Sequence, residues 1–90
     1  MTTVFGKIIQ GEIPAEIVFE NDLVIAIKDL YPIAPVHLLI IPKKEYKNLQ
    51  SLPQEDFGVL SEVVKVAKLL AQEYGISDGY RLLTNNGPSA

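Results

Sequence analysis

The 90-residue chain contains no cysteine and only one histidine. Without cysteine it can form neither a disulfide nor a thiolate metal site, a composition that fits a reducing compartment. One histidine without cysteine also leaves no plausible ligand set for zinc. We therefore expect no metal and no cofactor.

Basic residues and long apolar runs are also scarce. Eight lysines and arginines face eleven acidic residues, which gives a net charge of -3. Such a chain offers no basic field for a nucleic-acid backbone, so a nucleic-acid partner is not expected. No apolar run approaches the ~18–20 residues that span a bilayer, and the N-terminus lacks the pattern of a secretory signal. We expect no membrane partner and a cytoplasmic location.

The residues that are present are typical of a folded protein. Hydrophobic residues make up 48% of the chain and charged residues 21%, whereas disordered segments combine low hydrophobicity with high net charge. A chain of this length forms one domain at most. We predict a single domain over residues 1–90.

The first half of the sequence predicts a short helix followed by strands. Apolar spacing and Gly11 favour a helix over residues 4–10 that docks on a sheet. β-branched runs at 16–20 and 23–28, separated by Asn21-Asp22, predict a hairpin. Two prolines make 30–36 an ordered loop. Residues 37–41 then form a strand, and the continuous apolar run 38–41 predicts that it lies at the centre of the sheet.

The second half predicts a long amphipathic helix over 53–74 that stops at Gly75. Its apolar positions recur at three- and four-residue steps: Phe57, Leu60, Val64, Ala67, Leu70 and Tyr74. Alternation over 80–84 predicts a fourth strand, and Asn85-Asn86-Gly87 is a hairpin signal that asks for a returning strand. We therefore expect an α+β fold with a mainly antiparallel sheet, one short N-terminal helix and one long helix, incomplete at its C-terminus.

Five segments, taken in order, resemble the histidine triad (HIT) family in its Hint-like branch of nucleotide hydrolases. They are Phe5-Gly6-Lys7-Ile8-Ile9, Glu12-Ile13-Pro14-Ala15, Ile27-Lys28-Asp29, Ala34 through Lys43, and Gly79 through Asn85. The resemblance covers essentially the whole chain. It implies a HIT-like fold and a homodimer that binds purine nucleoside monophosphates and hydrolyses phosphoramidate or related bonds at the α-phosphate.

The sequence departs from that family in one respect. The signature His-x-His-x-His is not in these 90 residues, and the resemblance places it on a strand shortly beyond Gly87. Because a triad histidine is the family's nucleophile, we predict that the 90-residue chain is catalytically inactive. Two alternatives are a non-catalytic nucleotide-binding or dimerisation module, and an α+β interaction module without a ligand.

The resemblance assigns two polar residues to the nucleotide site. His37 matches a family histidine outside the triad that supports the phosphate site; its alternative role is an imidazole bonded to backbone at a strand start. Asp29 matches the carboxylate that accepts the ribose hydroxyls; its alternative is a turn-forming aspartate.

Five further residues match family positions around the nucleotide. The resemblance implies apolar walls for the purine, with core packing as the alternative, and these positions are Phe5, Ile13, Ile27 and Leu30. Asn85 matches an asparagine that hydrogen-bonds near the phosphate. Hairpin geometry suits Asn85 equally well.

Overall fold

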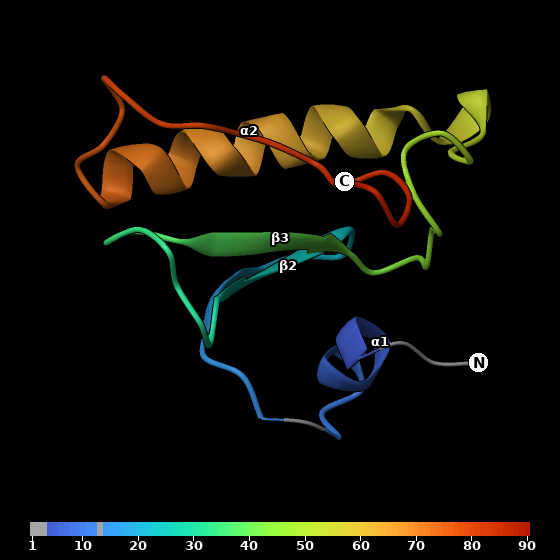
Figure 1. The fold of residues 1–90 in the computed structure, drawn as a ribbon, viewed down its shortest axis with the longest axis horizontal. Coiled ribbons are helices and arrows are strands. Elements are labelled where there is room, and N and C mark those ends of the chain that lie inside the picture. The colour runs from blue at the N-terminus through green and yellow to red at the C-terminus, as the bar shows by residue number, and fades with distance from the viewer. Residues whose placement is uncertain (1–3, 13) are drawn as a thin grey trace. The chain divides into compact units, whose positions relative to one another are not determined.

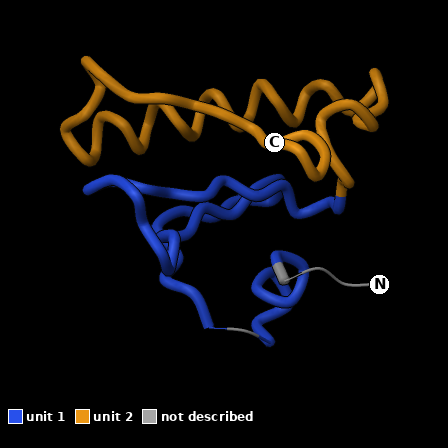
Figure 2. Tube along the Cα trace, viewed as in Figure 1, with its two compact units in different colours: residues 1–45 blue, residues 46–90 orange. Residues whose placement is uncertain are grey.

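The computed structural model describes residues 4–12 and 14–90 and has the expected α+β architecture (Figure 1). The chain divides into two compact units, residues 1–45 and residues 46–90 (Figure 2). The first contains α1 (Val4–Ile9) and three strands, and the second contains the long helix α2 (Gly58–Glu73). We describe each unit by itself. That residues 1–90 form one domain stays a prediction.

The first unit is built on an antiparallel sheet in the order β1-β2-β3. Its strands are β1 (Ile17–Glu20), β2 (Val24–Lys28) and β3 (Leu38–Pro42). The register pairs Ile25 with Ile41 and Lys28 with Leu38. This last pair brings the two ends of the β2–β3 loop together.

The core of the first unit lies on one face of that sheet. Ile25 and Ile27 alternate on β2, so they share a face and pack with Ile41 of β3. Ile8 and Ile9 of α1 pack against this cluster, as the apolar spacing of the helix predicts. The helix ends as predicted before Gly11, which has a φ of 78°. The Gly11 N–H donates to the Ile8 carbonyl and the Glu12 N–H donates to the Lys7 carbonyl, and these two bonds form a Schellman motif.

The predicted hairpin is confirmed, and Asn21 explains its turn. The Asn21 Oδ1 atom accepts the N–H groups of Leu23 and Val24, both at 2.9 Å. An asparagine side chain thus replaces the backbone acceptor that a tight turn would otherwise need.

Replacing Asn21 by alanine is expected to lower the free energy of unfolding by about 1 kcal/mol, because two backbone donors lose their acceptor at a partly solvated position. Chemical denaturation measures this change. Asp22→Ala, in the same turn, is the matched control and should change stability by less than about 0.5 kcal/mol. Equal effects of the two substitutions would contradict the assignment of the turn to Asn21.

The position of β3 in the sheet corrects one prediction. Among the described residues β2 is the central strand, with Val24, Ile25, Ala26 and Ile27 all buried, and β3 pairs only with β2. The continuous apolar run 38–41 indicated burial on both faces, but four of the five β3 residues are only partly buried. An apolar run does not by itself determine strand order, and β2 carries a run of the same kind, which is the buried one.

The second unit is dominated by α2, which begins later than the sequence predicted. A 3-10 turn at Gln54–Asp56 precedes it, and the Tyr46 hydroxyl donates to Asp56 Oδ2 at 2.8 Å. The helix stops as predicted at Gly75, whose φ is 71°. The N–H groups of Gly75 and Ile76 bond to the carbonyls of Gln72 and Ala71, which is a Schellman motif.

The buried face of α2 is not the predicted one. Val66, Leu70 and Ala71 are buried, whereas Phe57, Leu60 and Val64 are exposed. The helix carries apolar residues on two faces, and spacing alone did not say which face is covered. The sequence prediction held for Leu70 and was wrong for the exposed three.

The predicted strand over 80–84 is also absent from the described chain. Residues 80–86 form no ladder and are exposed throughout. Alternation makes a segment suitable for a sheet, but a strand also needs a neighbour that satisfies its backbone groups. The turn in this region lies later than the expected Asn85-Asn86-Gly87: Gly87 has a φ of 85°, and the Ala90 N–H donates to the Gly87 carbonyl at 3.3 Å.

Of the helices in the described ranges, none has the length and apolar character needed to cross a membrane.

Candidate functional site

The candidate site lies where the loop between β2 and β3 closes on itself. Antiparallel pairing ends at Lys28 and Leu38, so the next residues, Asp29 and His37, stand opposite each other. The Asp29 N–H donates to the His37 carbonyl at 3.1 Å. Two of the predicted site residues are therefore brought together by the sheet register.

The side chains of these two residues also meet. Asp29 Oδ2 lies 3.5 Å from His37 Nε2, and their side chains are only 22% and 29% exposed. This distance is at the long limit of a hydrogen bond. The contact becomes an ion pair only when the imidazole is protonated.

The remaining polar atoms of the pair bind the loop backbone. Asp29 Oδ1 accepts the Tyr31 N–H at 2.9 Å, and His37 Nδ1 accepts the Ile33 N–H at 3.2 Å. Both alternative roles from the sequence are thus present: Asp29 forms a turn and His37 bonds to backbone. Neither contact uses Asp29 Oδ2, which faces His37 Nε2.

A small cavity of about 130 Å³ opens beside the pair. It is lined by Lys28, Asp29, Pro32, Pro35, Val36, His37 and Leu38. Ligand pockets usually measure about 300–1,000 Å³, so this one has room for a fragment such as a sugar ring and not for a whole nucleotide. Its polar groups are a carboxylate, an imidazole and an ammonium beside proline walls, which suits hydrogen bonding to hydroxyl groups.

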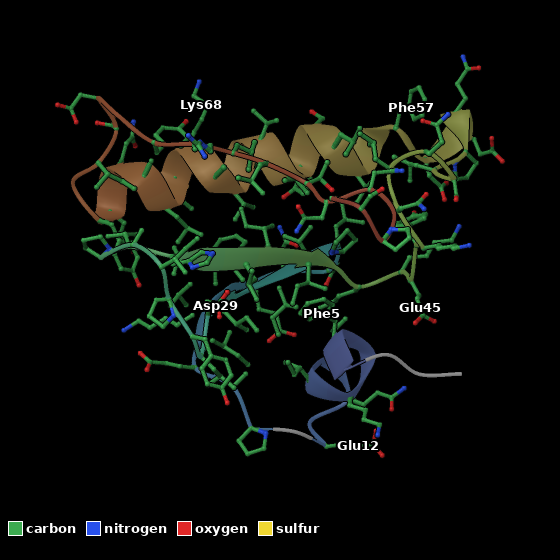
Figure 3. All side chains as sticks on the ribbon, in the orientation of Figure 1. Phe5, Glu12, Asp29, Glu45, Phe57 and Lys68 are labelled. Carbon is green, nitrogen blue, oxygen red and sulfur yellow. The ribbon has the colours of Figure 1, made fainter. Side chains whose placement is uncertain are left out.

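The three predicted apolar walls that the structure describes, Phe5, Ile27 and Leu30, do not line this cavity. Ile27 is 3% exposed and belongs to the core of the first unit, so core packing is observed for it. Phe5 on α1 is half-exposed and Leu30 is 74% exposed, so both present apolar surface to solvent. Figure 3 labels Phe5 on α1 and Asp29 at the end of β2. Their role as base walls stays a prediction.

Two predicted residues are not placed with the others. Ile13 lies outside the described residues. Asn85 belongs to the second unit, where it is exposed beside the turn at Gly87. Its neighbour Asn86 accepts the Gln50 N–H through Oδ1 at 2.7 Å.

Sequence reasoning missed the direct Asp29–His37 contact and the proline walls. A signal for both was available, because the two residues bracket one loop between strands that pair in register. Pro32 and Pro35 fix the loop backbone and line the cavity. In the part of the chain that the structure describes, no three histidine, cysteine, aspartate or glutamate side chains gather as a metal site.

Comparison with known proteins places this geometry in one family. Residues 2–89 match the family model described as "Scavenger mRNA decapping enzyme C-term binding". An uncharacterised HIT-like protein of Chlamydia muridarum is 51% identical over 87 residues, which cover 97% of this chain and 69% of that protein. A HIT family hydrolase from Clostridium thermocellum has a similar structure, with a TM-score of 0.90 and 46% identity over 93% of this chain and 74% of its own.

The description of a third relative names the class of ligand that it binds. The histidine triad nucleotide-binding protein from Candida albicans matches with a TM-score of 0.84 and 34% identity, over 96% of this chain and 63% of its own. The two solved structures therefore share the fold of this chain, and their descriptions state different functions, a hydrolase for one and nucleotide binding for the other.

Proposed function

The chain belongs to the histidine triad family, and on that premise we propose that it binds a purine nucleoside monophosphate or its phosphoramidate. The bond broken in the full reaction is the phosphorus–nitrogen or related bond at the α-phosphate. The first unit supplies the part of the site that holds the ribose. A cytoplasmic location stays a prediction from composition.

One observation carries this proposal: a carboxylate and an imidazole converge on a small cavity at the end of β2. Asp29 and His37 are two of the three polar residues that the family resemblance assigned to the nucleotide, and the strand register brings these two opposite each other. A carboxylate oxygen accepts hydrogen bonds from two adjacent hydroxyl groups, which is the chemistry that a ribose offers.

These 90 residues lack the groups that the hydrolytic step needs. Nucleophilic attack at phosphorus requires an activated nucleophile, and the leaving amine requires a proton donor. His37 is the sole histidine, and both of its ring nitrogens face protein atoms. The 90-residue chain by itself is therefore proposed to bind nucleotide without hydrolysing it.

The second candidate function is a non-catalytic nucleotide-binding or dimerisation module. It is supported by the cavity at the end of β2, where Asp29 and His37 supply polar groups for binding. The two candidates share the binding step and differ in whether hydrolysis occurs in a protein that also carries the triad.

Titration of the chain with adenosine monophosphate, followed by calorimetry, tests the binding step. We expect saturable binding with one site per chain and weaker binding of 2′,3′-dideoxyadenosine monophosphate, which lacks both ribose hydroxyls. Binding that does not distinguish these two nucleotides would remove Asp29 from the ribose contact. If neither nucleotide binds, the remaining hypothesis is the α+β interaction module without a ligand.

We also propose that the chain forms a homodimer through α2. Phe57, Leu60 and Val64 follow one another at three- and four-residue steps on an exposed face of this helix. An apolar stripe of this kind on a protein surface is typical of an interaction site. The family resemblance, which implies a homodimer, also favours the long helix and residues 80–84 as the segments at its interface.

Leu60→Asp is expected to shift the chain from dimer to monomer, because a carboxylate would be buried without a partner in an apolar interface. Sedimentation velocity at several protein concentrations measures the change. Ser61→Asp is the matched control, since it adds the same charge at a neighbouring exposed position of the same helix turn. A wild-type chain that is monomeric at all concentrations would refute the dimer.

A further inference from the structure

The Asn86-Gly87 pair lies on an exposed segment of the second unit. Residues 80–86 form no ladder, and Gly87 is exposed as they are. Within residues 4–12 and 14–90 the Gly87 N–H donates to no acceptor. A Cβ atom built at Gly87 would meet nothing within 4 Å, so the space around this junction is open. The peptide nitrogen of Gly87 is therefore both accessible and unbonded.

The backbone itself requires glycine at position 87. Its φ is 85°, a region that residues with a Cβ atom rarely adopt, and its carbonyl accepts the Ala90 N–H at 3.3 Å. Because glycine has no side chain, it is also the residue that shields its own peptide nitrogen least. The turn thus places an unshielded nitrogen directly after an asparagine.

A backbone donor holds and polarises the Asn86 side chain. The Gln50 N–H donates to Asn86 Oδ1 at 2.7 Å, across 36 positions of the sequence. In the part of the chain that the structure describes, Asn86 Nδ2 has no protein acceptor that would retain it. A donor at this distance stabilises negative charge that develops on a carbonyl oxygen. The contact therefore makes Asn86 Cγ more susceptible to attack by a nucleophile.

We propose that Asn86 and Gly87 form a self-modification site at which Asn86 loses its side-chain amide. The Gly87 nitrogen attacks Asn86 Cγ, so a nitrogen–carbon bond forms and the Cγ–Nδ2 bond breaks. The proton of the attacking nitrogen leaves with Nδ2 as ammonia, and a cyclic imide joins the two residues. Water then opens the imide at either of its carbonyls, which leaves an aspartyl or an isoaspartyl linkage at position 86. The reaction needs no reagent other than water.

The Gln50 N–H stabilises the intermediate of this reaction. Attack on Cγ places negative charge on Oδ1, which is the atom that the Gln50 N–H already contacts at 2.7 Å. The nucleophile and the electrophile are neighbours in one chain, so their encounter costs little entropy. Exposure, an unbonded glycine nitrogen and a donor on the carbonyl oxygen therefore act in the same direction.

The other three asparagines of the chain are internal controls. They precede residues with side chains, which shield the next peptide nitrogen, and these pairs are Asn21-Asp22, Asn48-Leu49 and Asn85-Asn86. Asn21 and Asn48 also accept backbone N–H groups through Oδ1. A donor on the oxygen is thus present at these two sites without the glycine. We expect Asn86 to react first.

The first test incubates the whole chain at mildly alkaline pH and follows the ammonia released. Mass spectrometry of proteolytic peptides, with aspartyl and isoaspartyl forms separated by chromatography, locates the lost amide. We expect loss at Asn86 in both forms while the other three amides are retained. Asn86→Gln keeps an amide but would require a larger ring, so it should release no ammonia on this timescale. Retention of the Asn86 amide, or earlier loss at another asparagine, would overturn the proposal.

The second test isolates the donor at position 50. Gln50→Pro removes the backbone N–H, whereas Gln50→Ala retains it and changes the same side chain. A single donor on a developing oxyanion contributes about 10²–10³-fold in enzyme sites, and at this exposed position we expect Gln50→Pro to react at least about fivefold more slowly than Gln50→Ala. Equal rates would contradict the role of the Gln50 N–H.

A peptide of residues 83–90 gives the same comparison without relying on the proline variant to fold. It carries the Asn86-Gly87 pair but not Gln50. We expect the wild-type chain to lose the Asn86 amide at least about threefold faster than this peptide, because only the chain has a donor on Oδ1. A chain that reacts as slowly as the peptide, or more slowly, would show that the fold protects Asn86 and would overturn the proposal.

Discussion

Replacing Asp29 by alanine is expected to weaken binding of adenosine monophosphate by about 10- to 100-fold. A hydrogen bond to a charged group contributes roughly 1.5–3 kcal/mol, and every 1.4 kcal/mol corresponds to a tenfold change in affinity. The Asp29 side chain is only 22% exposed and lines the cavity, so water entering the alanine variant restores only part of the lost hydrogen bonding. Calorimetric titration of both proteins measures the difference.

The loss has two possible origins, and the ligand separates them. Asp29 Oδ1 also accepts the Tyr31 N–H, so the substitution loosens the loop as well as removing the acceptor. With 2′,3′-dideoxyadenosine monophosphate the ribose bonds are already absent, and the two proteins should differ by less than about threefold. A difference as large as that for the natural nucleotide would assign the effect to the loop and not to the ribose.

Asp22→Ala is the matched control for this experiment. It removes a carboxylate of the same unit from an exposed turn outside the cavity, and so it changes the net charge equally. Its affinity should stay within about twofold of wild type, because exposed charges are screened over a Debye length of ~10 Å at moderate ionic strength. A similar loss in both variants would point to the long-range field of the protein.

The local elements of this fold could be predicted because single residues specify them. Gly11 and Gly75 take the positive φ that a helix end requires, and Asn21 satisfies the backbone of its turn. Each of these acts within a few residues of its own position. The bounds of α1 and of the three strands, and the end of α2, consequently came out within a few residues of the structure.

The covered surfaces could not be predicted in the same way. Which face of α2 is buried, and whether 80–84 pairs with a neighbour, depends on what lies next to each segment and not on its own pattern. Leu60 and Leu70 are equally apolar, yet one is exposed and the other is buried. Propensity and spacing identify segments able to bury a face, while tertiary contacts decide whether they do.

The candidate site could be predicted only in part, because its side-chain contacts also depend on the surrounding structure. Asp29 and His37 were identified through the resemblance, but that they are neighbours is seen only in the strand register of the structure. The direction of their side chains followed from the loop, because Ile33 and Tyr31 donate backbone N–H groups to them. No sequence pattern encodes that arrangement, so it could be described only from the structure.

Residues 1–90 alone are expected to hydrolyse an adenosine phosphoramidate no faster than buffer does, since they contain one histidine and it is engaged at both nitrogens. The same residues followed by a His-x-His-x-His strand taken from a HIT family hydrolase should turn the substrate over. General acid–base catalysis contributes ~10²–10⁴-fold, and a nucleophile adds to it, so the gain should reach at least about 10³-fold. Release of the amine, followed by liquid chromatography, measures both rates.

The decisive control is an extended chain in which each histidine of the added strand is replaced by asparagine. It should bind adenosine monophosphate as well as the active extension does and show no turnover, because an amide is neither a nucleophile nor a proton donor of suitable pKa. Turnover by residues 1–90 alone would place the chemistry on groups within the first 90 residues. An extended chain that binds but never hydrolyses would instead favour the non-catalytic nucleotide-binding module, in which Asp29 and His37 complete the function of the site.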